Sequence, residues 1–556
     1  MDCLSAGVKF SFGSSSQRLF RSYVLYKFLL DRAIRILLYR KDQQSVEFHF
    51  LFFRFNKPSL KKGPIPMDAN CIRDLAGIVG EPWVATDDEQ LKGYAKDNSF
   101  VSPRMPQCVA RPGCAEELEE AVRWANRTRT PLVPVSSGEP RLRGDTIPRL
   151  GGAVMDLQRM KRIVRIDRRN RVAVIEPGVT FGELVPALAR EGLRLNGPLL
   201  PRPNKSVLAS VLEREPGLMP RYQWDISDPL CCLEVVFGSG DRFRTGEAAG
   251  PGGLEAQWRI GGAQKFPLGP HQVDYHRLVQ GAQGTMGIAT WASIKCEILP
   301  KAKKLFFLHA ERIEDLVPFA YELTKKGYGD EVFLMNRVEL AALLKGAGIL
   351  PEFQAAQTGL PSWVLTFCIS GGAYFPEEQL EVLEKDLKEL AQSLGQVFSQ
   401  TAGDLPAARM LSLLDRCSDE PYWKYGVLGQ FREIFFITTL DRSPRFIETV
   451  RLLAGETGVP ESRIGVYLQP VVQGTSCHCE FDLFFDGEDA KESAKTRELF
   501  ERASSALIRQ GAFFSRPYPA WADEVYRTQG TFAETLKKVK AVFDPNGILN
   551  PGKLCF

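Results

Sequence analysis

Residues Ser206 to Gly246 read SVLASVLEREPGLMPRYQWDISDPLCCLEVVFGSGDRFRTG and join small residues, an acidic residue among bulky apolar neighbours, and an apolar run. The run from Cys231 to Gly238 is rich in β-branched residues and leads into Ser-Gly-Asp, which predicts a strand entering a hairpin. Asp225 lies between Trp224 and Ile226, where burial would raise the pKa of its carboxyl or a cation would hold it ionised. Both states suit acid–base work, but a structural carboxylate that caps a turn or pairs with an arginine fits the same pattern.

The composition bounds the class of protein. A chain of 556 residues, 44% hydrophobic and 25% charged, indicates a globular protein of two or three domains. The net charge of +4 comes from residues 1–66, which hold 12 basic and 4 acidic residues, so the remainder is close to neutral and predicts no nucleic-acid partner. The twelve cysteines include no CxxC pair, which argues against a zinc or iron–sulfur site and favours free thiols in a cytoplasmic protein.

Residues 1–66 form a basic, aromatic extension that lacks an apolar run long enough to span a bilayer. They are interpreted either as a targeting segment or as an extension outside the fold, with the working chain beginning at Met67. The second interpretation is favoured because the composition changes abruptly at that position.

Short strands alternate with helices from about Pro106 to Pro300, after an irregular segment over 67–106. The clearest helix covers residues 115–127, where Leu118, Ala121, Val122 and Ala125 share one face. A second domain with strand–helix–strand repeats follows over 301–500, and residues 501–556 form a last segment. The pattern predicts an α+β fold in which the second domain is a cap built from two similar, ferredoxin-like halves.

Two glycine-rich segments are candidates for close approach to a ligand. Residues 137–152, SGEPRLRGDTIPRLGG, combine freed backbone amides with arginines, which suits a pyrophosphate but also an ordinary surface turn. Gly281, Gly284 and Gly287 precede an apolar strand and allow either a close backbone approach or a tight helix-to-strand turn.

Several motifs, in this order, resemble the FAD-linked oxidoreductases of the vanillyl-alcohol oxidase and p-cresol methylhydroxylase type. They are the loop at 135–149, IEPGVTFGEL at 175–184, the opening stretch, RLVQGAQGTMGI at 277–288, and FDPNGILNPGK at 543–553. The resemblance covers about Pro106 to Phe556 and implies an FAD-binding domain over 67–300, a substrate cap over 301–500, and a segment over 501–556 that returns to the flavin. It further implies that FAD contacts Ser136, Ser137, Gly138, Gly144, Pro177, Gly178, Ser206, Gly281, Gly284, Gly287, Ile288, His478, Asn550 and Lys553.

The resemblance also assigns substrate-binding residues. Asp225 matches an aspartate near the flavin N5, and Arg516 matches an arginine that binds a phenolate, whereas Ser515 and Arg143 stand where tyrosines are expected. Two arginines would favour a delocalised or bidentate anion, although Arg143 could instead serve the FAD pyrophosphate. His478 is either a covalent attachment point for the flavin or a satisfied core residue.

The implied function is oxidation of a small 4-substituted phenol or aromatic alcohol by hydride transfer to flavin N5, with Asp225, Arg516 and Arg143 as catalytic residues. One alternative is a glycolate-type 2-hydroxy-acid dehydrogenase subunit that passes electrons to an iron–sulfur partner; its metal motif is incomplete because Val471 replaces the first histidine and only His478 remains, so no metal is expected. A second alternative is a non-catalytic flavin-binding subunit. The electron acceptor would be oxygen, a cytochrome or an iron–sulfur protein, and a homo-oligomer is compatible with all three functions.

Overall fold

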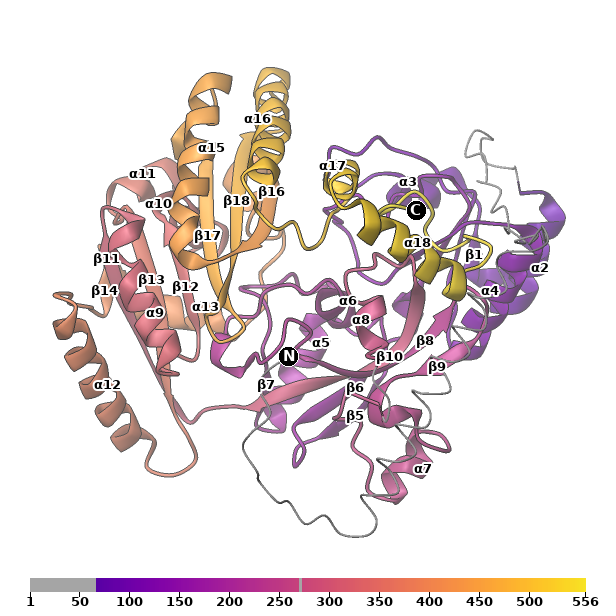
Figure 1. Cartoon of the computed structure of the whole chain (residues 1–556), viewed down its shortest axis with the longest axis horizontal. Coiled ribbons are helices and arrows are strands. Elements are labelled where there is room, and N and C mark those ends of the chain that lie inside the picture. Colours follow the sequence, from indigo (N-terminus) through magenta and orange to yellow (C-terminus); the bar gives the residue numbers. More distant parts are fainter. Residues whose placement is uncertain (1–66, 270–272) are drawn as a thin grey trace, which may run out of the picture. The chain divides into compact units, whose positions relative to one another are not determined.

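The computed structural model of the chain describes residues 67–269 and 273–556, so the expectations about residues 1–66 lie outside the described residues. The strands before position 299 form two sheets (Figure 1). These strands are β1 (Val84–Ala85), β2 (Cys108–Ala110), β3 (Leu132–Val135), β4 (Ala153–Asp156), β5 (Ile163–Asp167), β6 (Val172–Ile175), β7 (Leu193–Leu195), β8 (Leu230–Phe237), β9 (Arg242–Arg244) and β10 (Gly287–Ile298). The first sheet has the order β1-β2-β4-β3, with β4 parallel to both neighbours; the second is antiparallel, with the order β5-β6-β10-β8-β9, and β7 also pairs with β10.

The helices of this part are α2 (Ala69–Val79), α3 (Asp88–Ala95), α4 (Ala115–Thr128), α5 (Phe181–Arg190), α6 (Val207–Leu212), α7 (Leu254–Arg259) and α8 (His276–Val279). The expected hairpin is present, since β8 is buried along its whole length and pairs with β9. The prediction of an irregular segment over 67–106 is wrong, because α2 and α3 both lie within it. Asp68 and Asp87 cap these helices, accepting hydrogen bonds from the backbone N–H of Cys71 at 2.7 Å and of Gln90 at 3.0 Å.

The strands after position 300 form one antiparallel sheet, which we call the cap sheet, with the order β11-β13-β12-β17-β18-β16. They are β11 (Ala302–Ala310), β12 (Val332–Asn336), β13 (Trp363–Gly371), β16 (Gly429–Thr438), β17 (Ile464–Val471) and β18 (Ser476–Asp486); β14 (Thr401–Ala402) and β15 (Leu405–Pro406) pair separately. The helices are α9 (Val317–Lys325), α10 (Arg337–Gly346), α11 (Phe353–Thr358), α12 (Pro376–Ser393), α13 (Ala407–Leu414), α14 (Tyr425–Leu428), α15 (Ser443–Thr457) and α16 (Ala490–Arg509). The second half of the sheet follows a strand–helix–strand–strand–helix order, and the first half follows the same order with α10 and α11 inserted between β12 and β13. The halves meet where β12 pairs with β17, so the α+β class and the two similar halves are confirmed.

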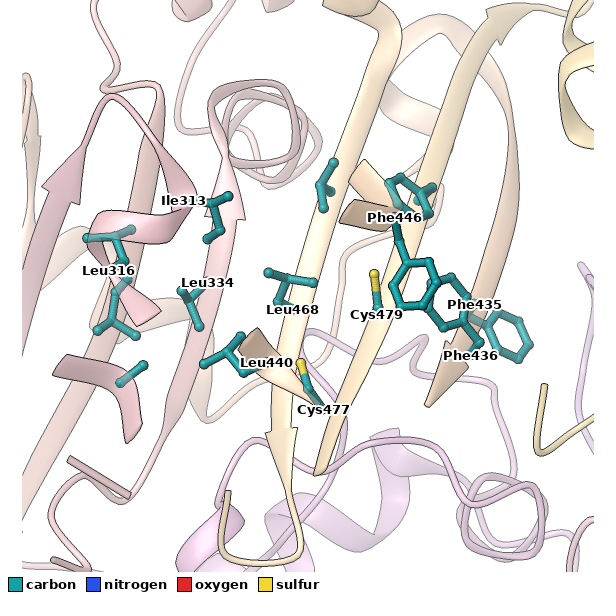
Figure 2. Packing of buried hydrophobic residues seen from close by; sticks show 14 of the residues in the cluster. Ile313, Leu316, Leu334, Phe435, Phe436, Leu440, Phe446, Leu468, Cys477 and Cys479 are labelled. Carbon is teal, nitrogen blue, oxygen red and sulfur yellow. The ribbon is translucent and has the colours of Figure 1, made fainter. Parts of the chain in front are cut away.

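The two faces of the cap sheet carry different helices. On one face, α9, α12, α15 and α16 cover an apolar core (Figures 1 and 2). Figure 2 shows Leu334, Leu468, Cys477 and Cys479, from neighbouring strands, among the residues of this core. On the other face, α10, α13 and α14 pack in a second cluster, which also includes Leu199 and Leu200 from the first part of the chain.

The end of the chain returns to the first sheet through α17 (Ala522–Arg527) and α18 (Gly530–Phe543), after which Leu549 forms a parallel bridge with Leu132 at the start of β3. The cap boundary expected at position 500 falls inside α16, which packs against α15 and β18. Among the described residues, no helix combines the length and apolarity needed to cross a bilayer.

Candidate active site

A cavity of about 1100 Å³, open solvent included, lies where β3, α6, the turn before β10 and the segment after α16 meet. We call it the first cavity. Its lining contains nine of the residues selected from the sequence, drawn from four separate segments: Ser136, Ser137, Arg143, Pro177, Gly281, Gly284, Gly287, Ile288 and Arg516. The structure therefore brings these predicted segments together around one space.

Close packing explains a glycine at the turn before β10. Gly284 has a φ of +70°, and a Cβ at this position would lie 2.3 Å from the Pro134 Cγ atom. A larger residue would push the turn away from β3 and change the wall of the cavity. Next to it, Gln283 also lines the cavity, and its Oε1 atom is buried without a hydrogen-bond partner among the described residues, so it offers a free acceptor to a ligand.

The first cavity also holds cations suited to a phosphate. Arg202 is buried and donates to the carbonyl oxygens of Gly138, at 3.3 Å, and Pro140, but within the described part of the chain it forms no ion pair. Burial lowers the pKa of its guanidinium, as expected for a buried cation without sufficient counter-charge. Lys205, by contrast, is neutralised by Glu213 at 3.1 Å and Glu215 at 2.5 Å.

Other predicted cofactor residues support the cavity without lining it. Ser206 caps α6 by accepting from the Ala209 N–H and donates to the Pro177 carbonyl at 2.6 Å. Asn550 donates to the carbonyls of Asp145 at 3.0 Å and Gln283 at 2.7 Å, and Lys553 donates to the Gly144 carbonyl at 2.5 Å. Gly138 directly follows the cavity residue Ser137, and Gly178 directly follows the cavity residue Pro177. A Cβ on Gly178 would lie 2.7–2.9 Å from three backbone carbonyl oxygens.

Arg516 is, like Arg202, a cation of the site that forms no ion pair within the described part of the chain. Its guanidinium is buried, lies 4.3 Å from the centre of the Phe435 ring, and has an Nη1 atom without a hydrogen-bond partner among the described residues. Burial and the nearby Arg143 lower the pKa of Arg516. A desolvated guanidinium of this kind is a binding site for an anion.

Arg143 does not provide the second free cation that the sequence suggested. Its guanidinium contacts Glu213 at 2.7 Å, Glu215 at 2.9 Å and Glu433 at 3.4 Å. Three carboxylates neutralise it, and the interpretation of Arg143 as a stabiliser of a substrate anion is corrected accordingly. Of the two arginines selected from the sequence, Arg516 is the one that fits that role.

A second cavity, of about 680 Å³ with open solvent included, lies between the first part of the chain and the cap sheet. It shares five lining residues with the first cavity, so the two spaces adjoin: Leu142, Arg143, Arg202, Lys205 and Arg516. Its cap wall carries aromatic and charged side chains: Glu339, Tyr422, Trp423, Lys424, Glu433, Tyr467 and Glu480. This wall comes from α10, β16, β17, β18 and the segment at α14.

Asp225 lies outside both cavities. Its side chain is 42% exposed, accepts from Ser227 at 2.6 Å, and pairs with Arg277 at 3.1 Å, while Trp224 beside it is 72% exposed. Partial burial raises the pKa of Asp225, but the hydrogen bonds from Ser227 and the charge of Arg277 lower this pKa more, so it lies below the usual value. The expectation that this carboxylate lies in an apolar environment is therefore wrong. The structure supports the alternative, in which Asp225 is a turn residue paired with an arginine.

His478 is buried, and its Nε2 lies 2.8 Å from the Glu480 Oε2 atom. It does not line the first cavity, where a flavin attachment point would have to lie. The structure therefore favours the interpretation of His478 as a core residue with a carboxylate partner. Burial lowers the pKa of His478, against the opposing effect of Glu480.

Sequence reasoning missed two sets of residues. Tyr518 lines the first cavity two positions after Arg516, so an aromatic hydroxyl does reach the site where tyrosines were expected elsewhere. Glu480 and Asp482 follow the selected His478 at a spacing of two and alternate with apolar residues along β18, and this alternation is visible in the sequence CHCEFDLFF. A period of two predicts that these polar groups share one face of the strand.

The comparisons with known proteins agree with this geometry. Residues 106–246 match the family described as FAD binding domain, and residues 522–554 match the C-terminal domain of FAD linked oxidases. The chain is 22% identical over 535 residues to the flavoprotein subunit of 4-cresol dehydrogenase [hydroxylating] of Pseudomonas putida, covering 90% of this chain and 98% of that protein. It is 29% identical over 476 residues to the glycolate oxidase subunit GlcD of Bacillus subtilis, covering 83% and 91%.

Solved structures show the same fold. The crystal structure of p-cresol methylhydroxylase with substrate bound matches with a TM-score of 0.72 at 20% identity, covering 89% of this chain and 98% of that one. An alkyldihydroxyacetonephosphate synthase matches with a TM-score of 0.61 at 14% identity, covering 88% and 86%. Proteins with such different names share the fold, so the fold alone does not define the substrate.

The match to an FAD binding domain, whose residues line most of the first cavity, and the match to the C-terminal domain of FAD linked oxidases together define an FAD-dependent enzyme. The chain is an FAD-linked oxidoreductase, and its fold is that of p-cresol methylhydroxylase. The first cavity fits this cofactor, because unpaired Arg202 suits the pyrophosphate and Gln283 offers a free acceptor.

Proposed function

We propose that the chain oxidises a small 4-substituted phenol or aromatic alcohol. The observation that carries this proposal is Arg516, a buried guanidinium that lines both cavities and has one nitrogen without a partner among the described residues. When bound, FAD supplies the acceptor for a hydride, and the protein supplies orientation and electrostatic stabilisation.

Arg516 binds the substrate oxygen and favours its ionised form. Tyr518 remains protonated, because burial raises its pKa well above 10, and its hydroxyl offers a hydrogen-bond donor to the same oxygen. A phenolate held in this way pushes electron density into the ring and lets a benzylic hydride leave. The aromatic side chains of the second cavity, Tyr422, Trp423 and Tyr467, suit an aromatic ring.

A 2-hydroxy-acid is the second candidate, since an unpaired guanidinium binds a carboxylate equally well and a glycolate oxidase subunit is among the relatives. Against it, Val471 occupies the position where that branch carries its first metal-binding histidine. The names of two relatives describe subunits, which supports a separate electron-accepting partner for this chain.

The test is an anaerobic substrate screen followed by bleaching of the flavin absorbance. We expect 4-alkylphenols or aromatic alcohols to bleach the flavin, and bleaching by glycolate or lactate alone would assign the second candidate. A holoprotein that no compound bleaches would contradict both and leave a non-catalytic flavin subunit.

The role of Arg516 is tested with Arg516→Lys, which keeps the charge but loses the planar donor pair. We expect a rate of flavin reduction at low substrate concentration that is about 10²-fold lower, which corresponds to about 2.7 kcal/mol, with unchanged FAD content. Arg312→Lys, at an exposed arginine of the cap, is the matched control and should retain the full rate. Equal rates in both variants would remove Arg516 from the mechanism.

A separate measurement concerns covalent attachment. Because His478 does not line the first cavity, we expect acid precipitation to release the flavin into the supernatant. Flavin that stays on the protein, and that the variant His478→Ala releases, would restore the histidine as the attachment point.

A further inference from the structure

One face of β18 carries buried, charged side chains beside the second cavity, and Glu480 of this face lines the cavity wall. His478, Glu480 and Asp482 follow one another at a spacing of two residues, and each is buried. Glu339 of α10 packs onto this face above Gly465 of β17, where a Cβ would lie only 1.9 Å from the Glu339 Oε2 atom. The glycine therefore makes the space that the Glu339 carboxyl occupies.

Lys424 is the cation at the centre of this wall. Its Nζ atom lies 2.6 Å from Glu480, 2.7 Å from Asp482 and 2.9 Å from Glu433. These three carboxylates converge closely enough to hold a cation, and the lysine ammonium occupies that position, so they serve as partners of Lys424 and not as metal ligands.

Other charged or titratable groups also face this cluster from the neighbouring strands and loops. Arg143 reaches Glu433 at 3.4 Å, and His478 lies 2.8 Å from Glu480. Tyr422, Tyr467 and Arg516 line the same cavity. Three carboxylates thus contact one ammonium, and Glu339 is a fourth carboxyl close enough to interact with it.

This arrangement cannot hold four ionised carboxylates, because buried like charges repel and lack solvation. Glu480 is the ionised member: burial opposes it, but Lys424 and His478 lower its pKa well below the usual range. Burial raises the pKa of Glu339 to about 7, and burial and the adjacent Glu339 raise the pKa of Asp482 strongly. Glu339 and Asp482, the two carboxyls with a raised pKa, are therefore the members of the cluster that can hold a single proton between them at neutral pH.

Glu339 also offers a buried acceptor atom beside the second cavity. Glu339 lines the second cavity, and its Oε2 atom is buried without a hydrogen-bond partner among the described residues. Arg516 Nη1 is likewise unpartnered and lines the same cavity. One ligand can therefore meet an anion site and a proton-exchanging carboxyl pair.

We propose that Glu339 and Asp482 form the proton acceptor for the hydroxyl of the substrate in the second cavity, an inference that rests on the proposed function. The substrate O–H bond breaks, its electron pair stays on the oxygen beside Arg516, and the proton passes to Glu339, the member of the pair that lines the cavity. The pair then holds two protons. A phenolate replaces a carboxylate, so the net charge of the buried site does not change.

The energetics favour this transfer. A phenol has a pKa of about 10 in water, and a cation at close range lowers it by about 1–3 units. The bound phenol then approaches the pKa of Glu339, at about 7. Proton transfer between groups of similar pKa is close to thermoneutral and is efficient.

The first experiment uses a phenol without an alkyl group, which can bind and ionise but has no benzylic hydrogen to lose. Phenolate formation on the holoenzyme is followed by absorbance, and protons released to a weakly buffered solution at pH 7 are followed with an indicator dye. We expect phenolate without proton release in the wild type. In Glu339→Gln and Asp482→Asn, each phenolate that forms should release about one proton.

Glu352→Gln, at an exposed glutamate of the cap, is the matched control and should behave as the wild type. Release of one proton per phenolate by the wild type, or retention by Glu339→Gln, would overturn the proposal. If the phenol binds to the wild type and to every variant without ionising, the result would contradict a phenol as the substrate. It would also contradict the role of Glu339 and Asp482 as proton acceptor.

The second experiment needs neither substrate nor turnover. A protonated carboxyl has an infrared carbonyl stretch that a carboxylate lacks, so the resting holoenzyme should show this band at pH 7. It should disappear in Glu339→Gln and in Asp482→Asn and persist in Glu352→Gln. A wild type without the band would overturn the shared proton, whatever the substrate screen finds.

Discussion

The two faces of strand β18 differ completely, although successive residues of one short strand form them in alternation. Cys477, Cys479, Phe481 and Leu483 point into the apolar core under α15 and α16. His478, Glu480 and Asp482 point to the opposite face and meet Lys424. A strand that is buried on both sides can thus carry packing on one side and ionisable groups on the other.

The difference separates stability from function. The apolar face gains free energy from burial and close packing, which do not depend on pH. The charged face requires desolvation of several ions, and a buried ion pair of this kind often stabilises a fold less than apolar residues would. Its retention beside the second cavity is consistent with a role in the reaction.

The largest effect is expected from Lys424→Met, which removes the cation shared by Glu433, Glu480 and Asp482. Buried carboxylates without a partner should lower the free energy of unfolding by about 3–5 kcal/mol at pH 7, measured by urea denaturation. Lys304→Met breaks the pair with Glu384, in which the lysine is 37% exposed, and should cost less than about 1 kcal/mol. Equal losses in the two variants would mean that the charged face is solvated.

The apolar face is tested one residue away from Asp482 by Leu483→Ala. The leucine is 1% exposed, so the cavity left behind should lower the free energy of unfolding by about 3 kcal/mol. The loss should be the same at pH 6 and pH 8, because no titratable group changes. A loss that varied with pH would show that the two faces are coupled.

The strand itself, and the segments that form the first cavity, could be predicted from sequence because they depend on local patterns. The alternation in CHCEFDLFF defines a strand, and Gly281, Gly284 and Gly287 define a tight turn. The partners of Arg143 could not be predicted in this way, because Glu213, Glu215 and Glu433 lie 70, 72 and 290 residues away in the chain. Whether an arginine is free or neutralised depends on such distant contacts.

The same limit applies to Asp225 and Lys424. A carboxylate between Trp224 and Ile226 suggests burial, yet the turn that Ser227 and Asp228 form exposes it. Lys424 lies in a short segment without a motif, and only the folding of α14 onto the cap sheet brings it to β18. Burial of single charged residues is a property of the packed structure.

A smaller effect, of opposite sign, is expected from Glu339→Gln. The pKa of Glu339 is raised from 4.5 to about 7, so the folded protein keeps a proton that the unfolded chain loses in this range. Stability contributed by that proton is therefore lost as pH rises from about 4.5 to 7. The variant lacks this loss, and its stability relative to the wild type should increase between pH 5 and pH 8 by about 1 kcal/mol or more. Parallel stability curves would contradict a raised pKa.

The smallest effect is expected from Asp225→Ala, which removes an ion pair outside both faces of the sheet. Asp225 and Arg277 are 42% and 51% exposed, and such pairs contribute less than about 1 kcal/mol to stability. Because the carboxylate lines neither cavity, the rate of flavin reduction by substrate should stay within about twofold of the wild type, measured by anaerobic stopped-flow beside Arg516→Lys. A severe loss of rate in Asp225→Ala would require this segment to move into the site during the reaction. The proton would then have an acceptor outside the charged face of β18, and the contrast between the two faces would lose its catalytic meaning.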